Sequence, residues 1–494
     1  MSTPLSHSRF YKPLLALLAV ALLFCSSAAQ RGLNRARGDL GFTRLTPLEN
    51  APPVLVLTTV VLGGFRGLIA NALWIRAMEL QEQDKYFEMV QLADWITKLQ
   101  PHMTTVWIVQ AWNMSYNISI KFSDPPDRWL WVLRGIELLR DQALKYNPDE
   151  VLLYRELAWH FQHKIGHYLD DAHLYFKNAW ATEMQQVLGG GRPNFDELIN
   201  PKTDQARASA TLLREKYKMD PAIMKAVDDQ YGPLEWRFPE THAIYWASVG
   251  RTKAKGKKED LITLRRVIYQ SMQMAFYRGR LVKSHFDNSY TFDANLDIVD
   301  KTNAAYEEMM AEDPEMRDHI GRAHKNFLLD AVYFLYTSNR MREAGKWLTV
   351  VKQKYPNDYP PGMSLDDYAV KRVTEDAGET DMNRTTGNIS GLLLQSFVNL
   401  ATDEDDKATV LALLARRIWE RYQGKISNSV SEKRVGLQPF EAMRQEILSR
   451  VLDPEKGFKP ELAAVVRTKL GLPAPSVTNA PPAQAQPQPP VKTP

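Results

Sequence analysis

The chain of 494 residues is 44% hydrophobic and 10% aromatic, so it can bury a large core and is not disordered as a whole. Its 62 Lys and Arg against 58 Asp and Glu leave a formal net charge of +4, a bias too weak to indicate a nucleic-acid partner. The single cysteine, Cys25, lies near the N-terminus, which excludes a disulfide framework, a cysteine zinc site and a catalytic thiol from the main body.

Residues 1–29 have the pattern of a signal peptide or a membrane anchor. Arg9 and Lys12 precede an uninterrupted apolar run from residue 13 to residue 25, and four small residues follow, up to Ala29. A basic start, a short apolar run and small residues are typical of a secretory signal peptide, with cleavage after Ala29. The same segment is also long enough to remain in the bilayer as a short anchor.

Residues 30–52 form a basic linker, and residues 53–75 form a second apolar segment. The second segment is free of charge from Val54 to Phe65 and continues after Arg66. Two interpretations stay open. One is a second transmembrane helix, in which Arg66 is an expensive interruption, and the other is a hydrophobic helix that docks onto the first repeat.

Two arrangements of these segments place the main body outside the cytoplasm. If both segments span the bilayer, the arginine-rich linker stays in the cytoplasm by the positive-inside rule, and the body lies outside. If only the first segment acts, with its basic end inside, the body again lies outside. A third arrangement, with the N-terminus inside and two spans, places the body in the cytoplasm. We expect a protein of the cell inner membrane whose main body is extracytoplasmic.

The rest of the chain predicts one helix after another. Apolar residues recur at three- and four-residue spacing, few runs alternate as strands do, and Pro and Gly breaks separate segments of helical length. The tail is rich in Pro, Ala and Gln and has too little apolar bulk to fold. The predicted class is all-α, with repeats over 70–188, an irregular insertion over 189–240, repeat-like and other helices over 241–360, C-terminal helices over 361–472, and a disordered tail over 473–494.

Bulky and small residues recur at the spacing of a 34-residue helix-pair repeat. The clearest copy begins near Val151, and its first-helix and then second-helix positions hold Tyr154, Leu157, Ala158 and Phe161, followed by Ala172, Phe176 and Ala179. With these residues the chain resembles the tetratricopeptide-repeat family over 70–184 and again over 325–358. The runs 86–95 and 111–117 are also similar to uncharacterised bacterial membrane-associated repeat proteins, a likeness that carries no known function.

The resemblance implies a superhelix of helix pairs, an α-solenoid, behind the N-terminal membrane segment. In such proteins the first helices line a concave groove that binds a protein or peptide. The alternative is that the same side chains pack against the next helix pair. We expect a membrane-tethered scaffold for protein assembly that is not an enzyme and needs no cofactor or metal. The expected groove residues are Trp112, Ser115, Tyr116, Arg155, Trp159, Gln162 and His163.

Two other functions stay open as alternatives. His160, His163 and His167 fall three and four residues apart, a spacing that can place imidazoles around a metal of a hydrolytic or metal-binding protein. The residue after His163 is Lys164, however, and a zinc-protease motif requires Glu there. The numerous tryptophans are most simply core, and a glycan-binding face in the envelope is the second alternative.

Overall fold

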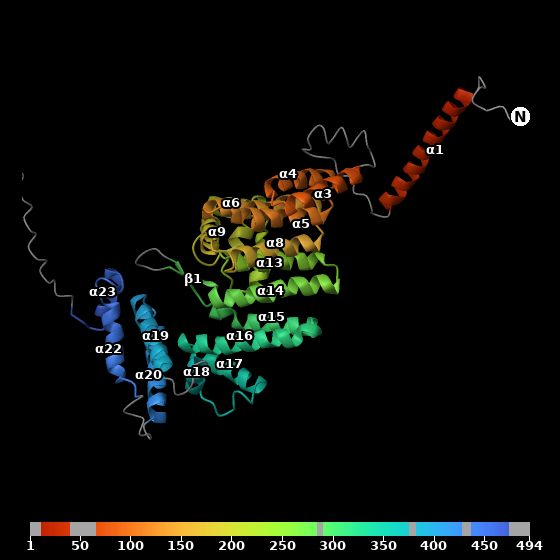
Figure 1. Ribbon diagram of the computed structural model, residues 1–494. Helices are drawn as coiled ribbons and strands as arrows, with labels where there is room; N and C mark the ends of the chain where they lie inside the picture. The colour runs from red at the N-terminus through yellow and green to blue at the C-terminus, as the bar shows by residue number, and fades with distance from the viewer. Residues whose placement is uncertain (1–10, 40–65, 284–289, 375–381, 427–435, 474–494) are drawn as a thin grey trace, which may run out of the picture. The chain divides into compact units, whose positions relative to one another are not determined.

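The computed structural model describes residues 11–39, 66–283, 290–374, 382–426 and 436–473 (Figure 1). Almost all regular structure in these ranges is helical, so the predicted all-α class is confirmed. The predicted tail from residue 474 onward lies outside the described residues. The chain divides into two compact units, residues 1–106 and residues 107–494.

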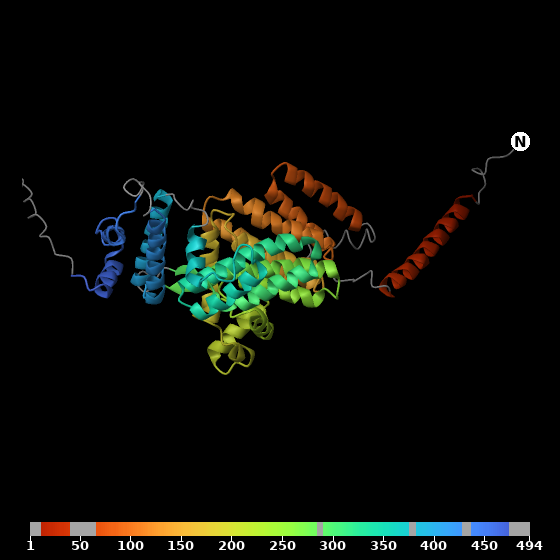
Figure 2. The ribbon, with the colours of Figure 1, turned by 90° about the horizontal axis from the view of Figure 1, so that it is seen from below.

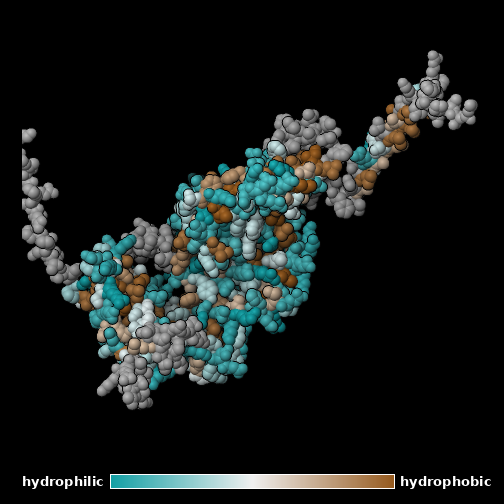
Figure 3. All heavy atoms as spheres, in the orientation of Figure 1, coloured by the Kyte–Doolittle hydropathy of each residue, from teal (hydrophilic) through white to brown (hydrophobic). Residues whose placement is uncertain are grey.

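The first unit contains α1 (Tyr11–Asp39), α3 (Arg66–Glu82), α4 (Tyr86–Leu99) and the first residues of α5 (Thr104–Trp112). Within the described ranges, α1 is the one helix long and apolar enough to cross a membrane, over Pro13–Leu33, and a signal sequence near an N-terminus has the same properties. Figure 3 shows apolar side chains standing exposed along this helix.

Helix α3 contains the second half of the predicted second apolar segment. Its Ala70 packs with Ala93 and Ile96 of α4 and with Val106 in a small core, which Leu73, Trp74 and Met103 cover in part. Residues 66–75 therefore belong to a helix with one face buried against protein. Residues 53–65 lie outside the described residues.

Most of the second unit consists of helices that pack on one another in chain order. Figure 1 shows α8, α13, α14, α15, α16 and α17 as successive layers, each in contact with the next. Their apolar faces supply the core, which includes Leu157 of α8, Phe276 of α14 and Phe327 of α16. The elements before the insertion are η3 (Asn113–Ile118), η4 (Ser119–Lys121), α6 (Pro125–Glu137), η5 (Leu138–Ala143), α7 (Leu144–Tyr146), α8 (Val151–Trp159), η6 (His160–Ile165) and α9 (His173–Leu188).

After the insertion come α13 (Pro239–Lys253) and α14 (Lys258–Arg278), which lead into a two-stranded antiparallel hairpin that the sequence analysis did not predict. Its strands β1 (Arg280–Lys283) and β2 (Tyr290–Asp293) pair Leu281 with Phe292. The next elements are η7 (Leu296–Ile298), α15 (Val299–Glu312), η8 (Pro314–Met316), α16 (Arg317–Thr337), α17 (Met341–Lys354) and α18 (Leu365–Thr374).

Glycines allow two close helix approaches in this unit. A Cβ at Gly135 of α6 would overlap Ser115 Oγ and lie 2.9 Å from the Ala111 carbonyl oxygen. A Cβ at Gly250 of α13 would lie 2.8 Å from Tyr154 Cβ of α8. Both distances are shorter than real Cβ contacts, so these two helix crossings require glycine.

The insertion over 189–240 was predicted to be irregular, and that prediction was wrong. It contains α10 (Phe195–Ile199), α11 (Asp204–Glu215) and α12 (Pro221–Tyr231), and Figure 2 shows it, in yellow to yellow-green, on one side of the layered helices. Each helix has a side-chain N-cap: Asn194, Thr203 and Asp220 accept hydrogen bonds from backbone N–H groups of the first turn. Such caps satisfy donors that a short helix otherwise leaves unpaired.

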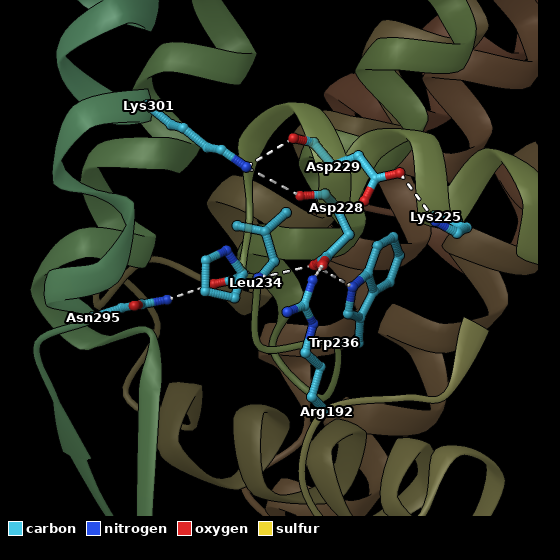
Figure 4. Close-up of polar contacts among 9 residues, drawn as sticks. Arg192, Lys225, Asp228, Asp229, Leu234, Trp236, Asn295 and Lys301 are labelled. Carbon is cyan, nitrogen blue, oxygen red and sulfur yellow. Dashed lines mark hydrogen bonds and ion pairs between the residues drawn. The ribbon is translucent and has the colours of Figure 1, made fainter. Parts of the chain in front are cut away.

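A buried carboxylate ties the end of this insertion together (Figure 4). Asp228 Oδ1 accepts hydrogen bonds from the Leu234 backbone N–H at 2.9 Å and from Trp236 Nε1 at 3.0 Å, and Arg192 forms an ion pair with Oδ2. Lys301 of α15 donates to the Asp229 carbonyl oxygen at 2.7 Å, where a cation offsets the negative end of the α12 dipole. Asn295 donates to the Pro233 carbonyl oxygen at 2.8 Å, so α12 and its following turn are held against the helix layers.

The C-terminal helices form a bundle around one long pair. Helices α19 (Met382–Ala401) and α20 (Asp405–Ile426) pack along each other, and α22 (Phe440–Val451) and α23 (Pro460–Lys469) pack on α19. Asp366 of α18 accepts a hydrogen bond from Tyr336 and pairs with Arg417 of α20, which links the bundle to α16 and α18.

Candidate functional site

Three π-helical turns lie in successive helices of the second unit. They are η3, η5 and η6, and each directly continues an α-helix, namely α5, α6 and α8. A π-helical turn inserts one extra residue into an α-helix and shifts the side chains that follow it, and such turns are frequent at functional sites. Two of the three, η3 and η6, contain residues that the sequence analysis assigned to a binding groove.

A series of ring contacts connects η3 with η6, and its members lie wholly or partly at the protein surface. We call Trp112, Tyr116, Trp159, His163, His167 and Tyr168 the ring ladder. The Trp112 and Tyr116 ring centroids lie 4.3 Å apart, those of Trp159 and His163 4.6 Å apart, and those of His163 and His167 5.8 Å apart. His167 and Tyr168 lie 4.3 Å apart at the end of the series.

Hydrogen bonds across the two helix pairs fix the ring ladder in place. Tyr116 Oη lies 3.1 Å from His163 Nδ1, and Trp112 Nε1 donates to Glu156 Oε2 at 2.9 Å. Glu156 is buried, and its other oxygen pairs with Arg155 at 2.5 Å. Because the polar atoms of Trp112 and Tyr116 bind groups within the protein, the surface offers a ligand the faces of these rings.

The protonation states of the ring ladder follow from burial. Burial, and then the negative charge of Glu156, raises the pKa of Tyr116 well above its usual value. Burial, and then the neighbouring His167 and Lys164, lowers the pKa of His163. At neutral pH the phenol therefore keeps its proton and the imidazole is uncharged, so the hydrogen bond between Tyr116 and His163 joins two neutral groups.

Five of the seven predicted groove residues reach the surface: Trp112, Tyr116, Arg155, Trp159 and His163. Ser115 and Gln162 do not, and their placement in a groove was wrong. Ser115 is fully buried where α6 crosses η3 at Gly135. Gln162 donates to the Val267 carbonyl oxygen and to Ser271 Oγ, both at 3.0 Å, so it joins η6 to α14 as the packing alternative predicted.

The rings of His160, His163 and His167 do not point toward a common metal position. His160 is fully buried, with Nδ1 2.8 Å from the Glu156 carbonyl oxygen, and His163 and His167 stack with their rings nearly parallel. Across the described residues, no three His, Cys, Asp or Glu side chains are grouped so as to hold a metal ion. Trp107, Trp129 and Trp180 are core residues, whereas Trp112 is exposed at the end of the ring ladder.

The loop at the other end of the ring ladder comprises residues 166–172, and its Tyr168 and Leu169 were not among the predicted groove residues. Asp170 accepts from Lys164 at 2.6 Å and from Arg128 at 2.9 Å, and all three side chains are buried. The Asp170 carboxylate also accepts the Ala172 backbone N–H at 2.9 Å. This fixed loop presents Tyr168 and Leu169 to solvent with 69% and 65% of their surface exposed.

Two further cations hold the start of the loop. Lys177 of α9 donates to the His167 carbonyl oxygen at 2.9 Å, and Arg278 of α14 donates to the Gly166 carbonyl oxygen. Burial, with the nearby charge of Arg278, lowers the pKa of Lys177 to about 8. Cations at these carbonyls offset the negative end of η6, so the exposed apolar loop is held by ionic contacts and not by a core of its own.

No family model matches the chain, and no curated protein or solved structure is significantly similar to it. The tetratricopeptide resemblance therefore stays a prediction. The ring ladder and the layered helices are therefore the features that bear on function.

Proposed function

We propose that this protein is a membrane-tethered helical scaffold that binds a segment of another protein on the ring ladder. The observation that carries the proposal is the unbroken series of rings from Trp112 to Tyr168, which crosses two helix pairs on the surface. Leu169, which follows Tyr168 in the chain, is exposed as well. Contiguous exposed apolar surface of this kind typically marks an interaction site in a folded protein.

The rigidity of the ring ladder favours binding over chemistry. Aromatic side chains that are already stacked and hydrogen-bonded lose little conformational freedom when a partner covers them. Arg155 lies beside the rings, paired with Glu156, and adds a planar cation at the rim. The layered helices extend this surface from neighbour to neighbour, which is the property of an α-solenoid.

The tether is the apolar segment Pro13–Leu33 of α1. A scaffold gains from an anchor because membrane attachment raises the local concentration of anything bound to it. In this proposal the partner is a protein of the same membrane or of the adjoining compartment, and the extracytoplasmic side is the side that the N-terminal sequence favours.

Site-specific photo-cross-linking in cells tests this function. A benzophenone amino acid at position 112 is expected to give a discrete adduct with a partner protein. The matched control is position 223 on α12, because Trp112 and Ile223 have the same exposed fraction of 40%. Changing Arg155→Ala and Trp159→Ala together should abolish the adduct at position 112. Equal labelling at both positions, or no adduct at position 112, would refute the proposal.

Glycan binding is a second candidate because Trp112 exposes an indole face. Quenching of tryptophan emission by envelope oligosaccharides, lost in Trp112→Ala, would favour it. If oligosaccharides leave the emission unchanged, this candidate is excluded.

A further inference from the structure

An apolar groove of about 290 Å³ lies in the C-terminal bundle, far along the chain from the ring ladder. Its wall comes from α19, α20 and α22, with Phe397, Leu400 and Phe440 among the lining side chains. Leu470, just after α23, completes the lining. Leu413 on the α20 side of the groove is 48% exposed, so apolar surface at the groove reaches solvent.

The charged groups at the groove satisfy one another. Glu441 pairs with Arg416 at 2.6 Å and lies 3.8 Å from Arg444. The two guanidinium groups also lie over rings, Arg416 5.0 Å from the Phe440 centroid and Arg444 5.8 Å from that of Phe397. A groove whose charges are paired internally suits an uncharged segment better than an acidic or basic one.

The chain itself supplies a segment of that chemistry at this place. Leu470 lines the groove, and the 21 residues from 474 to 494 follow almost at once. They contain seven prolines and one charged side chain, Lys492, and the first part, Val477 to Pro482, has no charge. Proline-rich chain adopts extended polyproline II geometry of about 3.1 Å per residue, a shape that aromatic-lined grooves bind.

We propose that the tail of the same chain docks in this groove through Val477 to Pro482. The tail has too little apolar bulk for a core of its own, but a preformed groove removes that need. From Pro473 to Pro481 an extended chain covers roughly 25 Å, enough to cross a groove whose lining already includes Leu470. Since the tail is tethered beside its site, an effective concentration on the order of millimolar lets even a weak contact be occupied. The docked tail would then exclude other apolar segments from the bundle.

Cysteine cross-linking in the full chain tests the docking. In a Cys25→Ser background, Ala483→Cys is combined with either Thr409→Cys or Ser449→Cys, and a short bismaleimide is added. Thr409 lines the groove and Ser449 does not. Both are exposed helical residues whose hydroxyl binds the carbonyl four residues earlier, so they are a matched pair. The expected result is an intramolecular cross-link at least about tenfold stronger for Thr409→Cys.

Two further variants test whether the cross-link depends on the groove and on the prolines of the tail. Ala412→Trp fills the groove and should remove the preference for Thr409→Cys. Pro481→Ser with Pro482→Ser should weaken the same cross-link without touching the folded bundle or the tether length. Equal yields at the two helix positions would overturn the proposal. A cross-link that joins two chains and grows with protein concentration would overturn docking within one chain and assign the groove to a second copy.

Discussion

Three donors surround the buried carboxylate of Asp228. The Leu234 N–H, the Trp236 indole and the Arg192 guanidinium all point at its two oxygens (Figure 4). We predict that Asp228→Ala lowers the free energy of unfolding by about 3 kcal/mol, since two buried N–H groups lose their acceptor. Urea denaturation followed by circular dichroism measures the change.

The neighbouring residue is the control for this prediction. Asp229 pairs with Lys225 at 3.3 Å, and its side chain is 61% exposed, so Asp229→Ala should cost less than about 1 kcal/mol. If the two variants unfold at the same urea concentration, Asp228 does not hold the turn after α12 as we describe.

His242 gives the protein a defined sensitivity to acid. Burial lowers its pKa from 6.5 to about 4, and its Nε2 binds the Trp236 carbonyl oxygen among the rings of Phe161 and Trp180. Between pH 6.5 and pH 4 the unfolded chain binds a proton that the folded chain does not. Stability therefore falls as the pH is lowered through this window, by about 3 kcal/mol in total.

We predict that His242→Phe makes the loss of stability between pH 6.5 and pH 4 shallower. His324, whose pKa is also lowered to about 4 by burial, retains its own contribution, so the slope should not vanish. The matched control is His319→Phe at an exposed position of α16, which should leave the slope as it is. Thermal unfolding at a series of pH values measures this loss of stability. An unchanged slope in His242→Phe would mean that groups other than His242 cause the acid sensitivity.

At the residue scale the sequence analysis grouped some of the predicted groove residues correctly and misplaced others. Helical spacing places Trp112, Tyr116, Trp159 and His163 near one another, and they do meet. Ser115 and Gln162 were misplaced because η3 and η6 are π-helical. In this wider turn, residues three apart no longer share a face, whereas residues four apart, such as Trp112 and Tyr116, still do. Nothing in the local sequence marks such a turn.

At the scale of elements, the close crossing of α6 over η3 depends on one missing side chain. A methyl group at Gly135 would overlap Ser115 Oγ and press on the Ala111 carbonyl oxygen. We predict that Gly135→Ala lowers the free energy of unfolding by about 1–3 kcal/mol through overpacking, despite the better helix propensity of alanine.

Gly345 of α17 is the matched control, since its added methyl would find nothing closer than 3.8 Å. Gly345→Ala should be neutral or stabilise the protein by up to about 1 kcal/mol. Opposite signs for the two substitutions in chemical denaturation are the expected result. A stabilising Gly135→Ala would show that the two helices separate at little cost.

Most helices were predictable because apolar residues at three- and four-residue spacing specify them directly. The short helices α10–α12 were missed although their signals were present: Asn194, Thr203 and Asp220 stand at N-caps, and Pro221 begins a helix. Gly189, Gly190 and Gly191 precede these helices, and consecutive glycines are typical of a loop. The β1–β2 hairpin was missed because each strand has four residues, too few for a two-residue period to stand out.

At the scale of the whole molecule, the side of the membrane decides which partners the ring ladder can meet. The sequence before the first helix pair holds two opposing signals. Arg9 and Lys12 precede the apolar run, and Arg31, Arg35, Arg37 and Arg44 follow or overlap its end. Positive charge favours the cytoplasmic side of a membrane segment, so the second group competes with the first unless the chain crosses again or the segment is cleaved.

We predict that alkaline phosphatase fused after Lys121 and after Leu472 is active, and that fluorescent protein at the same positions is dark, because the body lies outside the cytoplasm. Three arrangements give this pattern: a cleaved signal peptide, the first segment retained as an anchor with its basic end inside, and two spans with a cytoplasmic linker. Immunoblotting for the shortened chain separates cleavage from the other two, and a shortened chain would contradict the tether that we propose. Replacing the four linker arginines by glutamine should then leave reporter activity high after cleavage but lower it in the two-span case. Cytoplasmic fluorescence at both positions would contradict the prediction and would restrict the partners of the ring ladder to cytoplasmic proteins.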